Sequence, residues 1–425
     1  MAPSFAATAR RGATALATAA VLTAAVAPAA FADGAPSPAA PGLYGTNDPK
    51  FDGVFRQSLA FLAQHGSGVT PAKEAVDWLA GQQCADGGFP GFRADTGKAC
   101  DPQKDEFTDQ TAVAVQALAA VGGRSEAVTK GLDWLKARQN DDGGWGYQAG
   151  SPTDANSTSA AIGAFAATGQ DPAKAAVKNG KDPVAALLSF QLGCEAKEDE
   201  RGAFSYQRDK DGGLRADGLA SAAAGLAARG KGYAVDPVKQ DADQPVKPLD
   251  CAGDASAKPA GADAAAQAAS GYLSRTLEAN GGHLMSAMPG APAKPDQGMT
   301  ADTVLALAAG GHRAAAAKPL DWLRSKDSGT ADWAKGDPGK LAKLVLATRA
   351  AGGDPRDFAG TDLVAQLNAT GPKPASEGSS SPSAKPEKEK KEDKGGTFGA
   401  WWVVAVFFVA SVGVGFLLSG RKKKQ

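Results

Sequence analysis

Two kinds of helical pattern alternate along the middle of this 425-residue chain. One kind is amphipathic and is centred on an aromatic residue, as in "AVDWLAGQQCADGGF" at Trp78 and "GLDWLKARQNDDGGW" at Trp134. Three further segments align on Phe190, Tyr272 and Trp322. The first three aromatics follow one another at intervals of 56 residues, so the chain contains an internal repeat. A longer interval of 82 residues indicates an insertion at about residues 231–260.

The other kind of pattern is rich in Ala and Leu, as in "DQTAVAVQALAAVGG" from Asp109. Most of these segments open on Asp, Ser or Thr and close on Gly, which is the usual chemistry of helix ends. One more helix, "FDGVFRQSLAFLAQHG", precedes the first aromatic segment, and another, "TDLVAQLNATG", follows the last. The pattern predicts an all-α domain over residues 49–371, an (α/α)6 toroid of six Ala-rich inner and six amphipathic outer helices. An open solenoid is the structural alternative.

From Lys130 the chain reads K-G-x-x-W-L-x-x-x-Q-x-x-x-G-x-W, through Gln139, Gly143 and Trp145. This stretch resembles the QW repeat of squalene and oxidosqualene cyclases, in the wider toroid superfamily of protein prenyltransferases and transcobalamins. The resemblance implies a terpenoid cyclase-like fold over about three quarters of the chain. Gly143 or Gly144 can adopt a positive φ that ends the outer helix, while the Gln side chain bonds the helix end and the aromatic packs on its neighbour. The stretch therefore predicts a joint between the rings.

The same pattern is partial at Trp78 and degenerate further along, where Phe204, His283 and Trp333 fall at or near the terminal aromatic position. His283 stands where an aromatic residue is expected, either packed as a structural histidine or in contact with a ligand. Tyr147 either packs in the joint or lines a cavity.

The catalytic motifs of this superfamily are absent from the sequence. Cyclases protonate a polyene with D-x-D-D, and the nearest string, "DADQ" from Asp241, lies in the insertion. The chain has three His, none spaced near a Cys as in a zinc-binding prenyltransferase, and the thioester string G-C-G-E-Q is missing. We therefore expect no metal, no catalytic residue and no turnover. A hydrolase whose residues meet only in space stays open.

Polar residues gather at the predicted starts of the inner helices, and in a toroid these starts converge on one mouth of the central cavity. For any single residue of this set, helix capping is a sufficient explanation. Taken together they predict a ligand-binding rim, because small-molecule pockets combine apolar walls with a few polar groups. The rim residues are Thr108, Asp109, Gln110, Asp154, Asn156, Ser157, Arg215, Asp217, Asp302 and Thr303, with Tyr147 and His283 as the further candidates named above.

The resemblance to transcobalamins implies a corrinoid as ligand, and that to cyclases implies a terpenoid. The preferred hypothesis is a binding or scaffold protein for such a small amphipathic molecule, or for an envelope protein. The chain lacks the β domain that clamps the ligand in transcobalamins, so a separate clamp subunit would have to supply one. The alternative is an extracellular enzyme acting on an isoprenoid or a glycan. A net charge of zero gives no reason to expect nucleic acid as a partner.

The two ends of the chain predict export and anchoring. Residues 1–32 read as a signal peptide, with Arg10 and Arg11 before an apolar run that closes on Ala-Phe-Ala; twin-arginine export is the alternative to general secretion. Residues 33–48 read as a linker, and 372–397, rich in Ser, Pro, Lys and Glu, as a disordered stalk. Residues 398–419 are apolar enough to span a membrane, and the basic tail 420–425 should stay cytoplasmic. The toroid should therefore face outward from the cell surface.

Four cysteines lie in the part expected outside the cell. The pairing Cys84–Cys100 and Cys194–Cys251 is favoured, because each pair brackets a loop-like segment and exported thiols tend to oxidise. A four-cysteine zinc site is the alternative.

Overall fold

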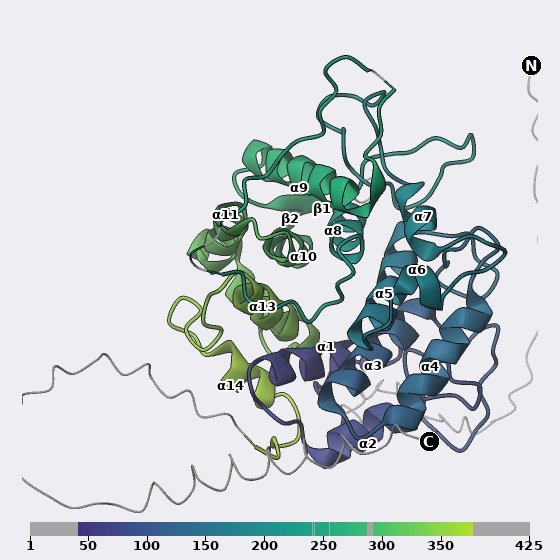
Figure 1. Ribbon diagram of the computed structural model, residues 1–425. Helices are drawn as coiled ribbons and strands as arrows, with labels where there is room; N and C mark the ends of the chain where they lie inside the picture. Colours follow the sequence, from purple (N-terminus) through teal and green to yellow (C-terminus); the bar gives the residue numbers. More distant parts are fainter. Residues whose placement is uncertain (1–40, 240, 242, 255, 287–291, 377–425) are drawn as a thin grey trace, which may run out of the picture. The chain divides into compact units, whose positions relative to one another are not determined.

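The computed structural model describes residues 41–376, apart from residues 240, 242, 255 and 287–291. Within this part the inner helices form a closed ring, in which each helix packs against the next and the last packs against the first (Figure 1). They are α1 (Gly53–Gly66), α3 (Thr108–Val121), α5 (Ala155–Ala167), α8 (Gly218–Ala227), α10 (Gln297–Ala309) and α13 (Pro338–Ala350). The closed ring confirms the toroid over the open solenoid.

Each outer helix packs on the inner helix that precedes it in the chain. The outer elements are α2 (Lys73–Gly81), α4 (Ser125–Arg138), α6 (Pro172–Ala175) with α7 (Pro183–Leu188), α9 (Gly261–Ala279), α11 (Arg313–Arg324) and α14 (Leu363–Asn368). A short 3-10 helix η1 (Lys326–Ser328) and α12 (Thr330–Ala334) connect α11 to α13. This alternation gives all inner helices the same direction, so that their N-terminal ends meet at one end of the ring.

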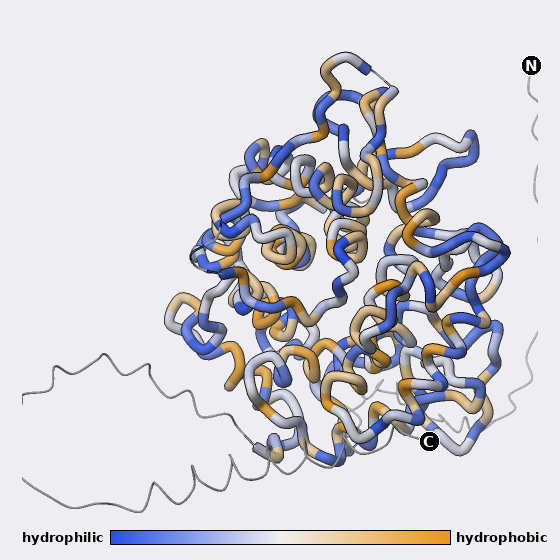
Figure 2. The backbone as a smooth tube through the Cα atoms, viewed as in Figure 1, coloured by the Kyte–Doolittle hydropathy of each residue, from blue (hydrophilic) through white to orange (hydrophobic). Residues whose placement is uncertain are grey.

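The sequence explains where the inner helices begin. Asp154, Asp217, Asp296 and Asp337 stand just before α5, α8, α10 and α13, and each carboxylate accepts the backbone N–H three residues on, at 2.7–3.1 Å. Such caps contribute about 0.5–2 kcal/mol each. The small Ala side chains inside the ring let neighbouring helices approach closely, while hydrophilic residues dominate the peripheral loops (Figure 2).

The stretch from Lys130 to Gln148 forms a joint between the two rings, as its pattern predicts. Gln139 Nε2 donates to the carbonyl of Gly143 in its own turn (2.7 Å) and to that of Ala176 in the next outer segment (2.8 Å). Gly143 has a φ of 92°, which favours glycine. Trp145 is fully buried, and its Nε1 donates to a carbonyl of α4 at 2.7 Å.

The same joint recurs at Gln83 and Gln191. Each side-chain amide donates to a glycine carbonyl of its own turn and to a carbonyl of the next outer segment, at 2.8–3.1 Å. The third repeat therefore aligns on Gln191, and the alignment of Phe190 with Trp78 and Trp134 is wrong. The reason is that α7 is short, so Phe190 lies beyond its end, directly before the glutamine.

The residue that ends each joint donates its backbone N–H to a hydroxyl on the following inner helix, at 2.8–3.0 Å. The donors are Phe89, Trp145, Phe204 and Leu284, and the acceptors are Thr111, Thr158, Ser221 and Thr300. In the fourth joint Leu284 therefore occupies the position that the sequence pattern assigns to His283. His283 lies one residue earlier and stacks on Trp322, with 4.4 Å between the ring centroids.

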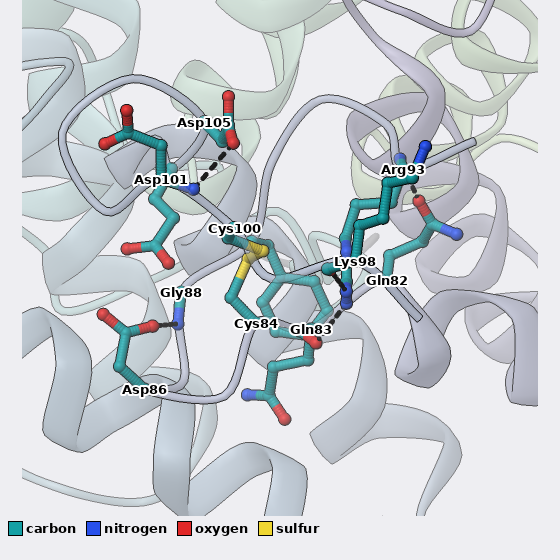
Figure 3. Close-up of a disulfide and its surroundings, with 12 residues drawn as sticks. Gln82, Gln83, Cys84, Asp86, Gly88, Arg93, Lys98, Cys100, Asp101 and Asp105 are labelled. Carbon is teal, nitrogen blue, oxygen red and sulfur yellow. Dashed lines mark hydrogen bonds between the residues drawn. A yellow bond between two sulfur atoms is a disulfide. The ribbon is translucent and has the colours of Figure 1, made fainter. Parts of the chain in front are cut away.

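Both predicted disulfides are present, Cys84–Cys100 and Cys194–Cys251. The first closes a surface loop in which Arg93 donates to the carbonyls of Gln83 (2.8 Å) and Lys98 (2.6 Å) (Figure 3). All four sulfurs are engaged in these bonds, so the alternative of a four-cysteine zinc site is wrong.

Three features of the described residues differ from the prediction. A small antiparallel hairpin, β1 (Leu284–Ser286) with β2 (Lys294–Asp296), interrupts the expected all-α pattern. Residues 41–48, expected as linker, pack on the domain with Tyr44 fully buried, and Ser376 of the expected stalk pairs with Thr70.

The signal peptide (1–32), the rest of the linker and stalk, the apolar segment 398–419 and the basic tail fall outside the described residues. Among the helices that the structure does describe, none has the length and apolar character needed to cross a membrane.

Candidate functional site

A cavity of about 170 Å³ lies at the centre of the ring, and all six inner helices contribute to its walls. Most of the wall is apolar, formed by Phe55, Ala222, Ala223, Leu226 and Leu305. Leu219 also lines the cavity and is 36% exposed, so the cavity reaches solvent beside it, at the N-terminal ends of the inner helices.

Asp109 is the most unusual polar residue of the cavity. It is the second residue of α3, whose N-cap is Phe107, so it does not cap the helix. Its Oδ1 is buried and has no hydrogen-bond partner. Burial first, and the nearby charge of Asp154 second, raise the pKa of Asp109 to about 7, although a hydrogen bond with Ser157 lowers it. Near neutral pH this carboxyl is therefore partly protonated, and it can both donate and accept a hydrogen bond.

Other polar atoms of the cavity wall also lack partners. They are Asn156 Oδ1 and Ser159 Oγ on α5 and Gln116 Nε2 on α3. The remaining charged pair is satisfied, because Lys343 Nζ on α13 donates to Asp302 Oδ2 on α10 at 2.6 Å. Buried polar groups are nearly always hydrogen-bonded. Several unpartnered ones around one cavity indicate a site for a ligand that would complete their bonds.

Aromatic side chains stand at the mouth of the cavity. Tyr147 and Tyr206 are 39% and 41% exposed. Gln110 Nε2 donates to the Tyr147 hydroxyl at 3.2 Å, and the Tyr147 ring lies 4.9 Å from that of Phe107, centroid to centroid. Partial burial raises the pKa of Tyr206, and the charge of Asp154 adds to this rise. The mouth thus combines phenol rings with carboxylates.

The structure separates the predicted rim residues into three groups. Asp109, Asn156 and Asp302 line the cavity. Gln110, Tyr147, Asp154, Ser157 and Asp217 surround its mouth or hold its helix ends. The other four do not reach it: Thr108 and Thr303 are buried and donate to the backbone carbonyls of Gly146 and Met299, Arg215 is exposed and pairs with Asp209, and His283 stacks on Trp322.

A floor loop, residues 231–238, crosses the ring at the C-terminal ends of the inner helices (Figure 1). It follows α8, and its Lys231, Gly232 and Tyr233 line the cavity. The sequence marks this segment only as the start of an insertion. Phe55, Gln116, Ser159 and Lys343 were missed as well. The spacing of seven residues between Asp109 and Gln116 would have placed both on one helix face.

Among the described residues, one group has the composition of a metal site, Cys84, Cys100 and Glu106. Its two sulfurs form a disulfide, so they are not available as ligands. Glu106 instead accepts a hydrogen bond from Trp134 Nε1 at 2.8 Å.

In comparison with known proteins, a family model matches the part of the chain that contains α3, α4 and α5. Residues 105–174 match the family model of the squalene-hopene cyclase C-terminal domain. The squalene–hopene cyclase of Zymomonas mobilis subsp. mobilis is 39% identical over 83 residues, 17% of this chain and 12% of that protein. The match thus spans about an eighth of the length of this curated relative.

Solved structures with a similar arrangement are more distant. The ent-copalyl diphosphate synthase from Streptomyces platensis is 17% identical with a TM-score of 0.43, over 70% of this chain and 50% of that chain. A protein from Actinoplanes is 16% identical with a TM-score of 0.43, over 74% and 94% of the two chains. A glycosidase is 14% identical with a TM-score of 0.41, over 71% and 86%.

The segment that matches the cyclase domain contains the complete QW joint and five residues that line the cavity, Asp109, Gln116, Asn156, Ser159 and Ala160. The resemblance to the terpenoid cyclase-like superfamily of α/α toroids, predicted from that joint, is confirmed.

Proposed function

We propose that the protein binds a small amphipathic molecule in its central cavity, with the apolar part of the ligand inside the ring and a hydrogen-bonding group on Asp109. The observation that carries this proposal is the unpartnered Asp109 Oδ1, together with the unpartnered atoms of Asn156 and Ser159, on walls that are otherwise apolar. Small-molecule sites combine such walls with a few polar groups that fix the orientation of the ligand.

The size of the cavity favours a small terpenoid over a corrinoid. A cavity of roughly 150 Å³ holds a molecule the size of benzene, and the volume here is about 170 Å³. An isoprenoid alcohol the size of one isoprene unit, such as prenol (3-methylbut-2-en-1-ol), is close to benzene in size and therefore matches the cavity as it stands, with its hydroxyl at the mouth. A corrinoid is much larger and would require the floor loop to leave the ring.

The location proposed for this activity is outside the cell. Two disulfides support an oxidising compartment, in agreement with the signal peptide and membrane anchor expected from the sequence. An envelope protein or clamp subunit, if one participates, would meet the ligand at the mouth, where Tyr147 and Tyr206 are exposed.

Isothermal titration of the purified full-length protein with prenol, and separately with cyanocobalamin, tests the proposal. We expect prenol to bind, and Asp109→Leu to weaken its binding about tenfold, because one hydrogen bond to a charged or partly charged group is lost. Asp211→Asn, on an exposed loop, serves as the matched control. Binding that is the same in Asp109→Leu and wild type would refute the role of Asp109. Cyanocobalamin binding with no prenol binding would refute the ligand class.

A second candidate function is acid catalysis by Asp109, and the raised pKa of about 7 favours it. The sequence suggests no proton donor, since D-x-D-D is missing, but burial keeps this single carboxyl partly neutral. In such a step the Asp109 proton would move to one carbon of a carbon–carbon double bond. The π electrons would form the new C–H bond and leave a carbocation on the other carbon. A water molecule would add to this carbocation, and the proton that the water then loses would return to the Asp109 carboxylate.

Deuterium incorporation separates the two functions. Prenol is incubated with the protein in D₂O, and the recovered isoprenoids are analysed by mass spectrometry. Deuterium on carbon with wild type, but not with Asp109→Asn, would establish catalysis. Tight binding without deuterium on carbon would establish the binding function alone.

A further inference from the structure

The insertion after α8 begins inside the ring. Its first residues form the floor loop 231–238, which runs from the end of α8 across the ring towards α13 (Figure 1). The loop packs directly on the backbone of α5, because a Cβ placed on Gly163 would lie 3.1 Å from the Cα of Gly232. Glycine at both positions therefore allows this close approach.

Hydrogen bonds hold the floor loop to two inner helices. Gln116 Oε1 on α3 accepts the N–H of Tyr233 at 3.0 Å. Arg349 Nη1 on α13 donates to the carbonyl of Val235 at 2.7 Å, and the N–H of Val238 donates to the carbonyl of Ala350 at 2.8 Å.

The rest of the insertion is anchored to the outer ring. The Gln244 carbonyl lies 2.8 Å from Nδ1 of the buried His312, which follows α10. Cys251 is joined to Cys194 by the second disulfide. Because the insertion is held at both rings, the floor loop is a fixed part of the cavity wall.

Tyr233 is the aromatic residue that this loop contributes to the cavity wall. Its ring packs edge-on against Phe55, with 6.4 Å between centroids and an interplanar angle of 85°. Its side chain lies close enough to Asp302 and Asp109 for their charges to add to the rise in its pKa, which burial mainly causes. The backbone of Tyr233 sits at the level of Gln116, and seven residues of helix separate Asp109 from Gln116, or about 10 Å along the axis. Tyr233 thus spans part of the depth below Asp109.

We propose that Tyr233 is the specificity-determining residue that sets the length of the apolar chain the cavity accepts. This inference rests on the proposed function, since a chain bound through its head group at Asp109 would extend towards the ring of Tyr233. The phenol ring is about as large as a benzene molecule, which needs roughly 150 Å³. Its removal should therefore nearly double the room below Asp109.

The probes are straight-chain alkan-1-ols from pentanol to dodecanol, titrated into purified full-length wild type, Tyr233→Phe, Tyr233→Leu and Tyr233→Ala. A methylene occupies about as much room as a water molecule, ~30 Å³, so the space freed in Tyr233→Ala holds about four or five more. Each additional buried methylene should strengthen binding about fourfold. We expect the tightest-bound alcohol to be longer by about that number of carbons in Tyr233→Ala, by fewer in Tyr233→Leu, and to be unchanged in Tyr233→Phe.

The outcomes distinguish this inference from the function on which it rests. Binding of alcohols with the same length optimum in all four proteins overturns the role of Tyr233 and leaves ligand binding in place. Failure of every alcohol to bind wild type, Tyr233→Phe and Tyr233→Leu overturns both. If Tyr233→Ala does not fold by circular dichroism, the comparison of Tyr233→Leu with Tyr233→Phe decides, because a shift is expected only in the former.

Discussion

Replacing Asp109 by Asn should stabilise the protein above neutral pH and leave its stability nearly unchanged at about pH 4. In the folded protein the pKa of Asp109 is raised to about 7, mainly by burial, from an ordinary value of 3.8. Between these two values the folded protein holds a proton that the unfolded chain has lost. Stability must therefore fall as the pH rises through this window. Asn has nearly the same shape as Asp and carries no charge, so the stability of the Asp109→Asn variant should not fall in this pH window.

The magnitude follows from the difference between the two pKa values. One pKa unit corresponds to about 1.4 kcal/mol, so roughly three units amount to about 4 kcal/mol at pH 8. About half of this difference should be present near pH 5.5, midway through the window. A stabilisation of this size is large, because whole domains are stable by only about 5–15 kcal/mol.

The assay is urea unfolding with the disulfides intact, followed by far-ultraviolet circular dichroism at about pH 4, 5.5 and 8. Glu106 has a pKa that is also raised to about 7, first by burial and then by a hydrogen bond with Asp86. It contributes equally to both proteins and cancels in their difference. Asp211→Asn, an exposed position, should show no such pH-dependent difference. A free-energy difference between Asp109→Asn and wild type that stays constant from pH 4 to 8, or that has the opposite sign, would refute the reasoning.

Three further changes test the scaffold by the same unfolding assay. Gln139→Ala should lower the free energy of unfolding by about 1–3 kcal/mol for each of the two carbonyls left without a donor, those of Gly143 and Ala176. Gln366→Ala, at an exposed position, should lower it little. Equal losses in the two variants would argue against a structural role for the joint. In the chain-entropy model, removing the disulfide Cys194–Cys251, which spans 57 residues, should lower the free energy of unfolding by about 4 kcal/mol. Removing Cys84–Cys100, which spans 16 residues, should lower it by about 3 kcal/mol. A larger loss for the shorter loop would contradict this model. Asp217→Ala should lower the free energy of unfolding by about 0.5–2 kcal/mol, because the Ala220 N–H loses its acceptor. If helix capping is the role of Asp217, Asp217→Asn should retain most of the wild-type stability.

The ring could be predicted from the sequence because it depends on repeated local signals. Ala-rich and amphipathic segments alternate, Asp residues begin the helices, and the Gln–Gly–aromatic joint at Gln139 is complete. Register was predicted less well. Phe190 matches the spacing of 56 residues but lies beyond a short helix, and His283 lies one residue before the true joint residue, Leu284. Both errors arise because an aromatic ring can be aligned without knowing which residue makes the backbone hydrogen bond.

The cavity was predicted only in part, because a helix start does not reveal which residue faces the axis. Thr108, Asp109 and Gln110 are consecutive, and successive helical residues point about 100° apart. Thr108 faces the carbonyl of Gly146, Gln110 faces Tyr147, and Asp109 alone of the three lines the cavity. Tyr233 could not be predicted at all, since its position depends on where an insertion without helical periodicity folds in space.

The joints also explain why the chemistry of the cavity differs from one repeat to the next. Four joints fix an inner helix through a hydroxyl that accepts a backbone N–H, and at the fourth, Thr300, the residue two positions earlier is Gly298, which does not line the cavity. In the other three the hydroxyls are those of Thr111, Thr158 and Ser221. The residue two positions earlier is turned by about 200°, away from the joint and towards the axis of the ring. In these three repeats that residue is an acid, an amide and an apolar residue, namely Asp109, Asn156 and Leu219, and all three line the cavity. Since the hydroxyl alone makes the structural bond, this position can change without loss of the joint. The fold is therefore stabilised by what the repeats share, and in the proposed function ligand choice would be set where they differ.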